Sequence, residues 1–162
     1  MIWTHIKSLI RHKWFVIIAG IRLGVPLWRL LVHDLSKLSR SELRDYAQWF
    51  HGGGRNGLGF EYAWLHHQNR NAHHPEYWIE RTILARENNL NTTTALSMPE
   101  MYIREMIADW MGASRTKTGS WDIRHWLISP SFYGASRLSR MPFHDSTRVR
   151  IWEILEGIYP SN

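Results

Sequence analysis

An aspartate at an apolar position of a predicted helix constrains this chain more than any other feature. It stands in the segment Leu30-Leu-Val-His-Asp-Leu-Ser-Lys37. A helix that begins near Pro26 would place on one face Leu27, Leu30, Leu31 and Asp34. A carboxylate that points into an apolar core is costly unless it is paired or binds a metal. The adjacent His33 offers a second ligand, so we expect a bound cation here.

The composition limits which metals and partners are compatible with the chain. It has no cysteine, which excludes disulfides, thiolate zinc sites and iron–sulfur clusters, so its ten histidines and its carboxylates must supply any metal ligands. The formal net charge of +6 favours phosphorylated small molecules, nucleic acid or an anionic membrane surface as partners. The ten tryptophans are expected to fill a helical core, with stacking on bases as the alternative.

Residues 14–32 are the stretch that most resembles a membrane span. Arg22 and Arg29 interrupt it, and Gly24-Val25-Pro26 would break a helix in its middle. We therefore expect no membrane span, but two buried helices joined by a turn. An amphipathic N-terminal helix at a membrane surface is the alternative. The sequence lacks the cleavage site of a secretory signal, and a cytoplasmic location fits the absence of cysteine.

Helix start and stop signals predict one all-α domain over residues 1–162, a compact bundle of about six to eight helices without strands. Capping boxes are expected at Ser39 with Glu42 and at Ser97 with Glu100. Residues 88–96 and 114–120 are expected to be loops. The predicted helices cover about residues 2–23, 26–38, 39–50, 97–112, 121–127 and 146–158, with two more beginning near Phe60 and Pro75.

Two further ligand candidates lie on apolar helical faces. In the first predicted helix, His12 shares a face with Leu9 and Val16, and in the helix after Ser97, Asp109 shares one with Met106. Each residue alone has an ordinary explanation as a satisfied core histidine or a paired carboxylate. Two internal carboxylates, an internal histidine and a His-Asp pair on separate helices together predict a metal site.

Four histidines lie within nine residues in the middle of the chain: His66, His67, His73 and His74. If one helix continued through them, His67 and His74 would share a face, whereas His66, Arg70 and His73 would share the next. One set could then bind a second metal, and the other could contact a substrate or the ligands themselves. A histidine-rich surface turn is the alternative.

The order His12, His33-Asp34, Asp109 resembles the H…HD…D ligand pattern of the HD-domain metal-dependent phosphohydrolases. Lys37 matches the HD-x-x-K form of that pattern. The resemblance covers residues 10–115 and implies an HD-domain-like helical bundle around one or two divalent ions of manganese, iron, cobalt, magnesium or zinc. The four histidines at 66–74 stand where binuclear members carry additional histidines. The Gly-Tyr-Pro element of the HD-GYP phosphodiesterases is missing, so cyclic-dinucleotide cleavage is not implied.

The chain also resembles a family of small bacterial and phage proteins that has no established activity. Four segments of this chain resemble sequence motifs that recur in that family: residues 33–37, 63–71, 73–78 and 105–112. The HD resemblance itself implies hydrolysis of a phosphate ester, with a nucleotide as the expected substrate and with Lys37 and Arg70 acting on its phosphate. Arg115 and Lys117 of the predicted loop are weaker candidates for that contact.

Several alternatives stay open at this point. The metal centre could belong to an HD-type diiron oxygenase, or the chain could be a basic nucleic-acid-binding protein without catalysis. Glu61 and Glu105 are expected on helical surfaces, with a role as base or bridging ligand as the alternative. A homodimer is a further expectation, through the apolar residues of the last helix, Val149, Trp152, Ile154 and Leu155.

Overall fold

The first two helices form a hairpin at the N-terminus of the computed structural model, which describes residues 1–54, 56–80, 94–129 and 136–159. Helix α1 (Ile2–Arg22) ends where Gly24 takes a positive φ of 73°, and α2 (Leu27–Val32) follows Pro26. The sequence predicts both ends of α1 to within one residue. Among the described residues, no helix is long and apolar enough to cross a membrane.

The predicted helix over residues 26–38 is wrong in its second half. Helix α2 stops at Val32, and a short 3-10 helix, η1 (Leu35–Leu38), follows. Between them Asp34 has a φ of 59°, and it is the only non-glycine residue with a positive φ in the described chain. Lys13 of α1 stabilises this break, because its Nζ donates to the carbonyl oxygens of Leu31 at 2.6 Å and His33 at 2.9 Å.

The apolar face proposed for that helix is therefore also wrong. Leu27 and Leu31 are each more than half exposed, and of the three leucines only Leu30 is buried. Asp34 is nevertheless buried, because the left-handed turn, rather than a helical repeat, directs it inward. An aspartate adopts this left-handed backbone conformation more readily than most residues do. The conformation is nevertheless uncommon outside glycine, and it is concentrated at functional sites.

Two helices and a turn carry the middle of the chain. Helix α3 (Leu43–His51) leads to α4 (Gly57–Arg70), which begins three residues earlier than predicted because the Asn56 side chain accepts from the Gly59 amide. After Arg70 the chain turns and forms a 3-10 helix, η2 (Pro75–Trp78). Neither predicted capping box forms: α3 begins after Glu42 and α6 (Glu100–Thr118) after Pro99, each without a side-chain cap.

The sequence predicts no strand, which is wrong for two short segments. Strand β1 (Ile79–Glu80) pairs antiparallel with β2 (Thr94–Ala95). The rest of the expected connector, residues 88–93, lies outside the described residues. The expected loop at residues 114–120 is also wrong in part, because α6 continues to Thr118 and ends at Gly119, whose φ is +79°.

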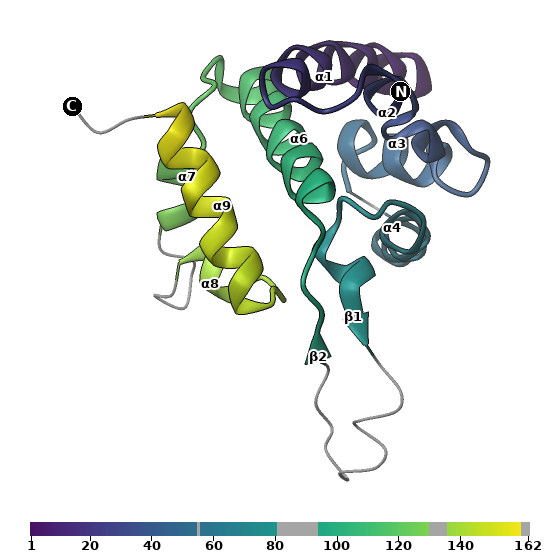
Figure 1. The fold of residues 1–162 in the computed structure, drawn as a ribbon. Coiled ribbons are helices and arrows are strands. Elements are labelled where there is room, and N and C mark those ends of the chain that lie inside the picture. Colours follow the sequence, from purple (N-terminus) through teal and green to yellow (C-terminus); the bar gives the residue numbers. More distant parts are fainter. Residues whose placement is uncertain (55, 81–93, 130–135, 160–162) are drawn as a thin grey trace, which may run out of the picture.

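Helix α6 occupies the centre of the fold, with α1 across one end of it (Figure 1). Figure 1 shows α3 and α4 on one side of α6, and α7 (Arg124–Ile128), α8 (Arg137–Arg140) and α9 (Asp145–Ile158) on the other. Buried aliphatic residues of α1, α2, α6, α7 and α9 form the main core, among them Val16, Leu30, Ile107, Leu127 and Ile151. The expectation of an all-α fold is confirmed.

Helix α9 contributes to that core, because Ile154 and Leu155 are buried within the chain. Of the four residues expected at a dimer interface, only Val149 is largely exposed, whereas Trp152 is half-buried. The tryptophans fill the core only in part: four of them are half-buried and pack against it, Trp78, Trp110, Trp121 and Trp152. None of the ten falls in the buried class, and Trp3, Trp14 and Trp28 are more than 60% exposed.

Candidate metal centre

Asp34 lies at the meeting point of α1, α4, α6 and the turn between α2 and η1. Its Oδ2 is 3.4 Å from His33 Nε2 and 3.9 Å from His12 Nε2. Asp109 Oδ1 faces the same two histidines, at 2.8 Å from His12 Nε2 and 3.4 Å from His33 Nε2. We call these four residues site A; one ligand atom from each lies within 4.8 Å of the others.

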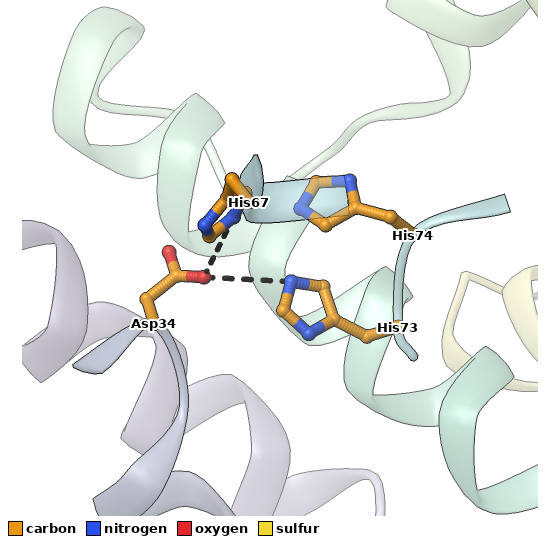
Figure 2. Close-up of side chains that lie close together, drawn as sticks. All are labelled: Asp34, His67, His73 and His74. Atoms are coloured by element: carbon orange, nitrogen blue, oxygen red, sulfur yellow. Dashed lines mark ion pairs between the residues drawn. The ribbon is translucent and has the colours of Figure 1, made fainter. Parts of the chain in front are cut away.

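The other oxygen of Asp34 faces a second set of histidines. Asp34 Oδ1 is 3.2 Å from His67 Nε2 and 3.5 Å from His73 Nε2, as the dashed lines in Figure 2 show. His74 completes this set, which we call site B, with all four ligand atoms again within 4.8 Å of one another. Asp34 thus belongs to both sites through different oxygens, an arrangement that suits a carboxylate bridging two ions.

Site B contains polar atoms that lack hydrogen bonds. Apart from the contacts of Asp34 Oδ1 with His67 and His73, Asp34 Oδ1 and the Nε2 atoms of His67, His73 and His74 are buried without a hydrogen-bond partner in the described part of the chain. Such atoms are rare in folded proteins and call for a bound ion or water. One carboxylate oxygen and three imidazole nitrogens that converge in this way form a donor set suited to a divalent transition metal. The residues present therefore fit a cation.

Buried glutamates orient one histidine of each site. Glu105 Oε1 lies 3.2 Å from His33 Nδ1, and Glu42 Oε2 lies 3.0 Å from His67 Nδ1. In both cases the Nε2 atom of the same ring then faces Asp34. A carboxylate on one ring nitrogen fixes the orientation of a histidine ligand and increases its basicity.

The surrounding charges act differently on the histidines. Burial lowers the pKa of His33, but Asp34, Asp109 and Glu105 outweigh it and raise the pKa to about 10. For His67, Asp34 and Glu42 likewise outweigh burial, so its pKa is raised. Burial and the neighbouring His33 lower the pKa of His73 to about 3.

The remaining pKa directions agree with a centre of buried ion pairs. Burial and the histidines His73 and His67 hold the pKa of His74 well below its usual range. For Asp34, burial opposes ionisation, but His33 and Lys37 outweigh it and hold the pKa well below its usual range. The centre thus combines ionised carboxylates with neutral imidazoles at His73 and His74, whereas His33 and His67, whose pKa values are raised, would have to release a proton when a metal binds.

The structure brings together seven of the eight candidate ligands named from the sequence. His66 is the exception: its Nδ1 lies 2.6 Å from Glu42 Oε1 and its side chain is partly exposed, outside both sites. The predicted division of the four histidines is wrong, because α4 ends at Arg70 and the following turn brings His73 beside His67 and His74 instead of His66.

The two cations expected to act on a phosphate lie in different places. Lys37 Nζ is 2.5 Å from Asp34 Oδ2, inside the centre. Arg70 is exposed at the C-terminal end of α4 and belongs to neither site. Of the weaker candidates, Lys117 lines the cavity beside site A, whereas Arg115 donates to the Gly119 carbonyl oxygen.

Sequence reasoning missed the roles of two glutamates. The spacing Ser39-x-x-Glu42 predicts a capping role for Glu42, yet it is fully buried and contacts His66, His67 and Ser36. The sequence predicts a helical surface position for Glu105, yet it is buried and pairs with Arg29 at 2.6 Å as well as with His33. The spacing of Glu105 and Asp109, four residues apart on α6, was a signal that both face the same way.

A cavity of about 380 Å³ adjoins the centre. His12, Asp109, His74 and Lys37 line its inner end, so ions bound at the two sites would border it. Tyr46, Phe50, Phe60 and Trp64 contribute an aromatic wall, and His5, Thr116 and Lys117 add polar groups. Both ring nitrogens of His5 are buried without a hydrogen-bond partner among the described residues, and burial and His51 lower its pKa to about 4.

Comparisons with known proteins identify a family but no activity. No curated protein and no solved structure was found to match this chain. Over residues 1–157, which include every residue of sites A and B, the sequence matches the family of unknown function DUF5662. The chain therefore belongs to the DUF5662 family.

Proposed function

We propose that the protein is a metal-dependent phosphohydrolase with two adjoining divalent-metal sites. The observation that carries the proposal is the position of Asp34, whose two oxygens face two separate histidine sets. The resemblance of His12, His33-Asp34 and Asp109 to the HD-domain pattern supports the same class of reaction. On this proposal, site A and site B each hold one ion, with Asp34 common to both.

Divalent ions in such a centre lower the pKa of a bound water and polarise a phosphoryl oxygen. The protein's own residues hold and orient the ligands: Glu105 fixes the ring of His33, and Glu42 fixes that of His67. Lys37 keeps Asp34 ionised and, because it also lines the cavity, it is the cation best placed to contact a phosphate. Arg70, being exposed outside both sites, has no part in this proposal.

The cavity favours an organic phosphate ester over inorganic polyphosphate. Its aromatic wall offers stacking to a planar group, and the neutral ring of His5 can exchange a hydrogen bond with an uncharged polar edge. A nucleotide combines such a planar group with a phosphate. We therefore keep a nucleotide as the proposed substrate, and the cytoplasm, where nucleotides are abundant, as the proposed location.

Elemental analysis combined with a phosphate-release screen tests the proposal. We expect the purified protein to bind divalent ions stoichiometrically and to release phosphate from nucleoside monophosphates, nucleoside triphosphates or cyclic nucleotides. Asp34→Asn should abolish both properties, whereas His125→Gln, at an exposed histidine of α7, should change neither. Failure to load manganese, iron, cobalt, magnesium or zinc would contradict the proposal.

The histidine content of site B supports one alternative reaction. Three imidazoles and one carboxylate oxygen suit iron as well as zinc, cobalt or manganese. Oxygen consumption by the iron-loaded protein, without phosphate release under any metal, would replace hydrolysis by the diiron oxygenase alternative. A metal-free protein that binds DNA tightly would instead favour the nucleic-acid-binding alternative.

A further inference from the structure

An exposed apolar row runs along α1. Trp3, Ile10, Trp14 and Ile21 are 59–67% exposed. They are spaced at i, i+7, i+11 and i+18, which places all four within about 40° of one another around a helix of 3.6 residues per turn. A row of this kind, with two tryptophans, is unusual on a surface that only meets water.

Helix α2 and η1 carry further exposed apolar residues. They pack beside α1, where Leu30 of α2 lies against Gly20 and Lys13 contacts the end of α2. Their exposed residues are almost all large and apolar, with exposed fractions of 49–62%: Leu27, Trp28, Leu31, Val32, Leu35 and Leu38. We call the row on α1 the apolar face, and these six residues lie on the neighbouring helices.

The charges beside the apolar face have one sign. Asp34 is the first acidic residue of the chain, whereas Lys7, Arg11, Lys13, Arg22 and Arg29 all precede it. Two of these cations are engaged inside the protein, Lys13 with backbone carbonyls and Arg29 with Glu105. Lys7, Arg11 and Arg22 are exposed and follow one edge of the apolar row on α1.

We propose that the apolar face docks on the surface of an anionic lipid bilayer. An interfacial helix buries apolar and tryptophan side chains at the boundary of headgroups and acyl chains, while cations at its edge contact anionic headgroups. The apolar row on α1 and the three exposed cations beside it match both requirements. The alternative occupant, a second copy of the chain, would bring the same cations together across a two-fold axis, which opposes association.

Docking in this orientation leaves the cavity open. His5, Ser8 and His12 line the cavity, and they lie on the side of α1 opposite the apolar row. The bilayer would therefore not cover the metal centre. The proposal is also independent of the proposed phosphohydrolase function, because it uses neither the ligands nor an activity.

Vesicle flotation of the full-length protein tests the docking directly. We expect the protein to float with vesicles of 70% phosphatidylcholine and 30% phosphatidylglycerol, and to remain with the soluble fraction when the vesicles contain phosphatidylcholine alone. Neutralising the three exposed cations together (Lys7→Gln, Arg11→Gln, Arg22→Gln) should weaken the binding about a hundredfold, since each cation near an anionic surface contributes about 1 kcal/mol, a factor of about five.

Matched variants separate docking from a general loss of structure. Ile10→Gln with Trp14→Gln should abolish flotation, whereas Leu58→Gln with Tyr62→Gln, at equally exposed positions of α4, should leave it unchanged. Circular dichroism checks that all variants are folded. The proposal is overturned if the wild type does not float with anionic vesicles, if both double variants lose binding equally, or if sedimentation shows a dimer that Ile10→Gln with Trp14→Gln dissociates.

Discussion

Gly112 of α6 lies so close to Val16 of α1 that a Cβ at residue 112 would come within 2.6 Å of Val16 Cγ2 and 2.9 Å of its backbone nitrogen. His12 precedes Val16 by four residues, and Asp109 precedes Gly112 by three. The close contact therefore lies one turn from the His12–Asp109 pair, and it sets the separation of the two helices that carry that pair.

Replacing Gly112 with alanine should separate α1 from α6. The added methyl group meets backbone, which cannot move aside as a flexible side chain can, so we expect a loss of about 1–3 kcal/mol in unfolding free energy. Urea denaturation measures this. Gly157→Ala in α9 is the matched control: nothing lies within 4 Å of its added Cβ, and the change should stabilise the protein by up to about 1 kcal/mol. Equal effects of the two substitutions would contradict this account.

Glu42→Gln tests the orientation of His67. Glu42 is fully buried and holds the Nδ1 atoms of both His66 and His67. Loss of its charge should weaken metal binding at site B about 10–100-fold, because a histidine ligand depends on the carboxylate behind it. Isothermal titration calorimetry with Mn²⁺ or Zn²⁺ measures the change. Glu61→Gln, at an exposed glutamate of α4, should have no effect, and an unchanged affinity in Glu42→Gln would show that Glu42 does not support the site.

Much of the fold could be predicted because local signals fix it. The end of α1 at Gly24, the start of α2 after Pro26 and the extent of α9 follow from glycine, proline and apolar spacing. The break at Asp34 could not be predicted in this way. It depends on Lys13, twenty residues away from His33 in the sequence, which satisfies the carbonyl oxygens at the end of α2.

In the candidate site, too, some features follow from local sequence signals and others depend on distant contacts. The order and spacing of His12, His33, Asp34 and Asp109 predict a common site, and the structure brings them together. Which of the four later histidines would join Asp34 depended on where α4 ends and how the chain turns before Pro75. The role of Glu42 is not predictable from local sequence, because Ser39-x-x-Glu42 satisfies the local capping pattern, whereas burial against His66 and His67 is a tertiary effect.

The acid stability of the protein should depend on Glu100. Arg150 and Arg104 pair with this carboxylate and lower its pKa to about 2, from an ordinary value of 4.5. Because the folded state favours the ionised form, the stabilising contribution is complete above pH 4.5 and is lost as the pH falls towards 2. The melting temperature of Glu100→Gln should therefore lie below that of wild type at pH 6, with the difference shrinking towards pH 2. A constant difference over that range would contradict this assignment.

The sharing of Asp34 predicts a distinctive pattern of metal loss. His12 belongs only to site A and His74 only to site B, whereas Asp34 belongs to both. His12→Gln and His74→Gln should therefore each retain about one of two bound ions, and Asp34→Asn should retain neither, because the donor set loses ligand charge at both sites. Mass spectrometry of the native protein counts the ions. If the wild type and His74→Gln each bind a single ion, site B is not a metal site, and the centre is mononuclear.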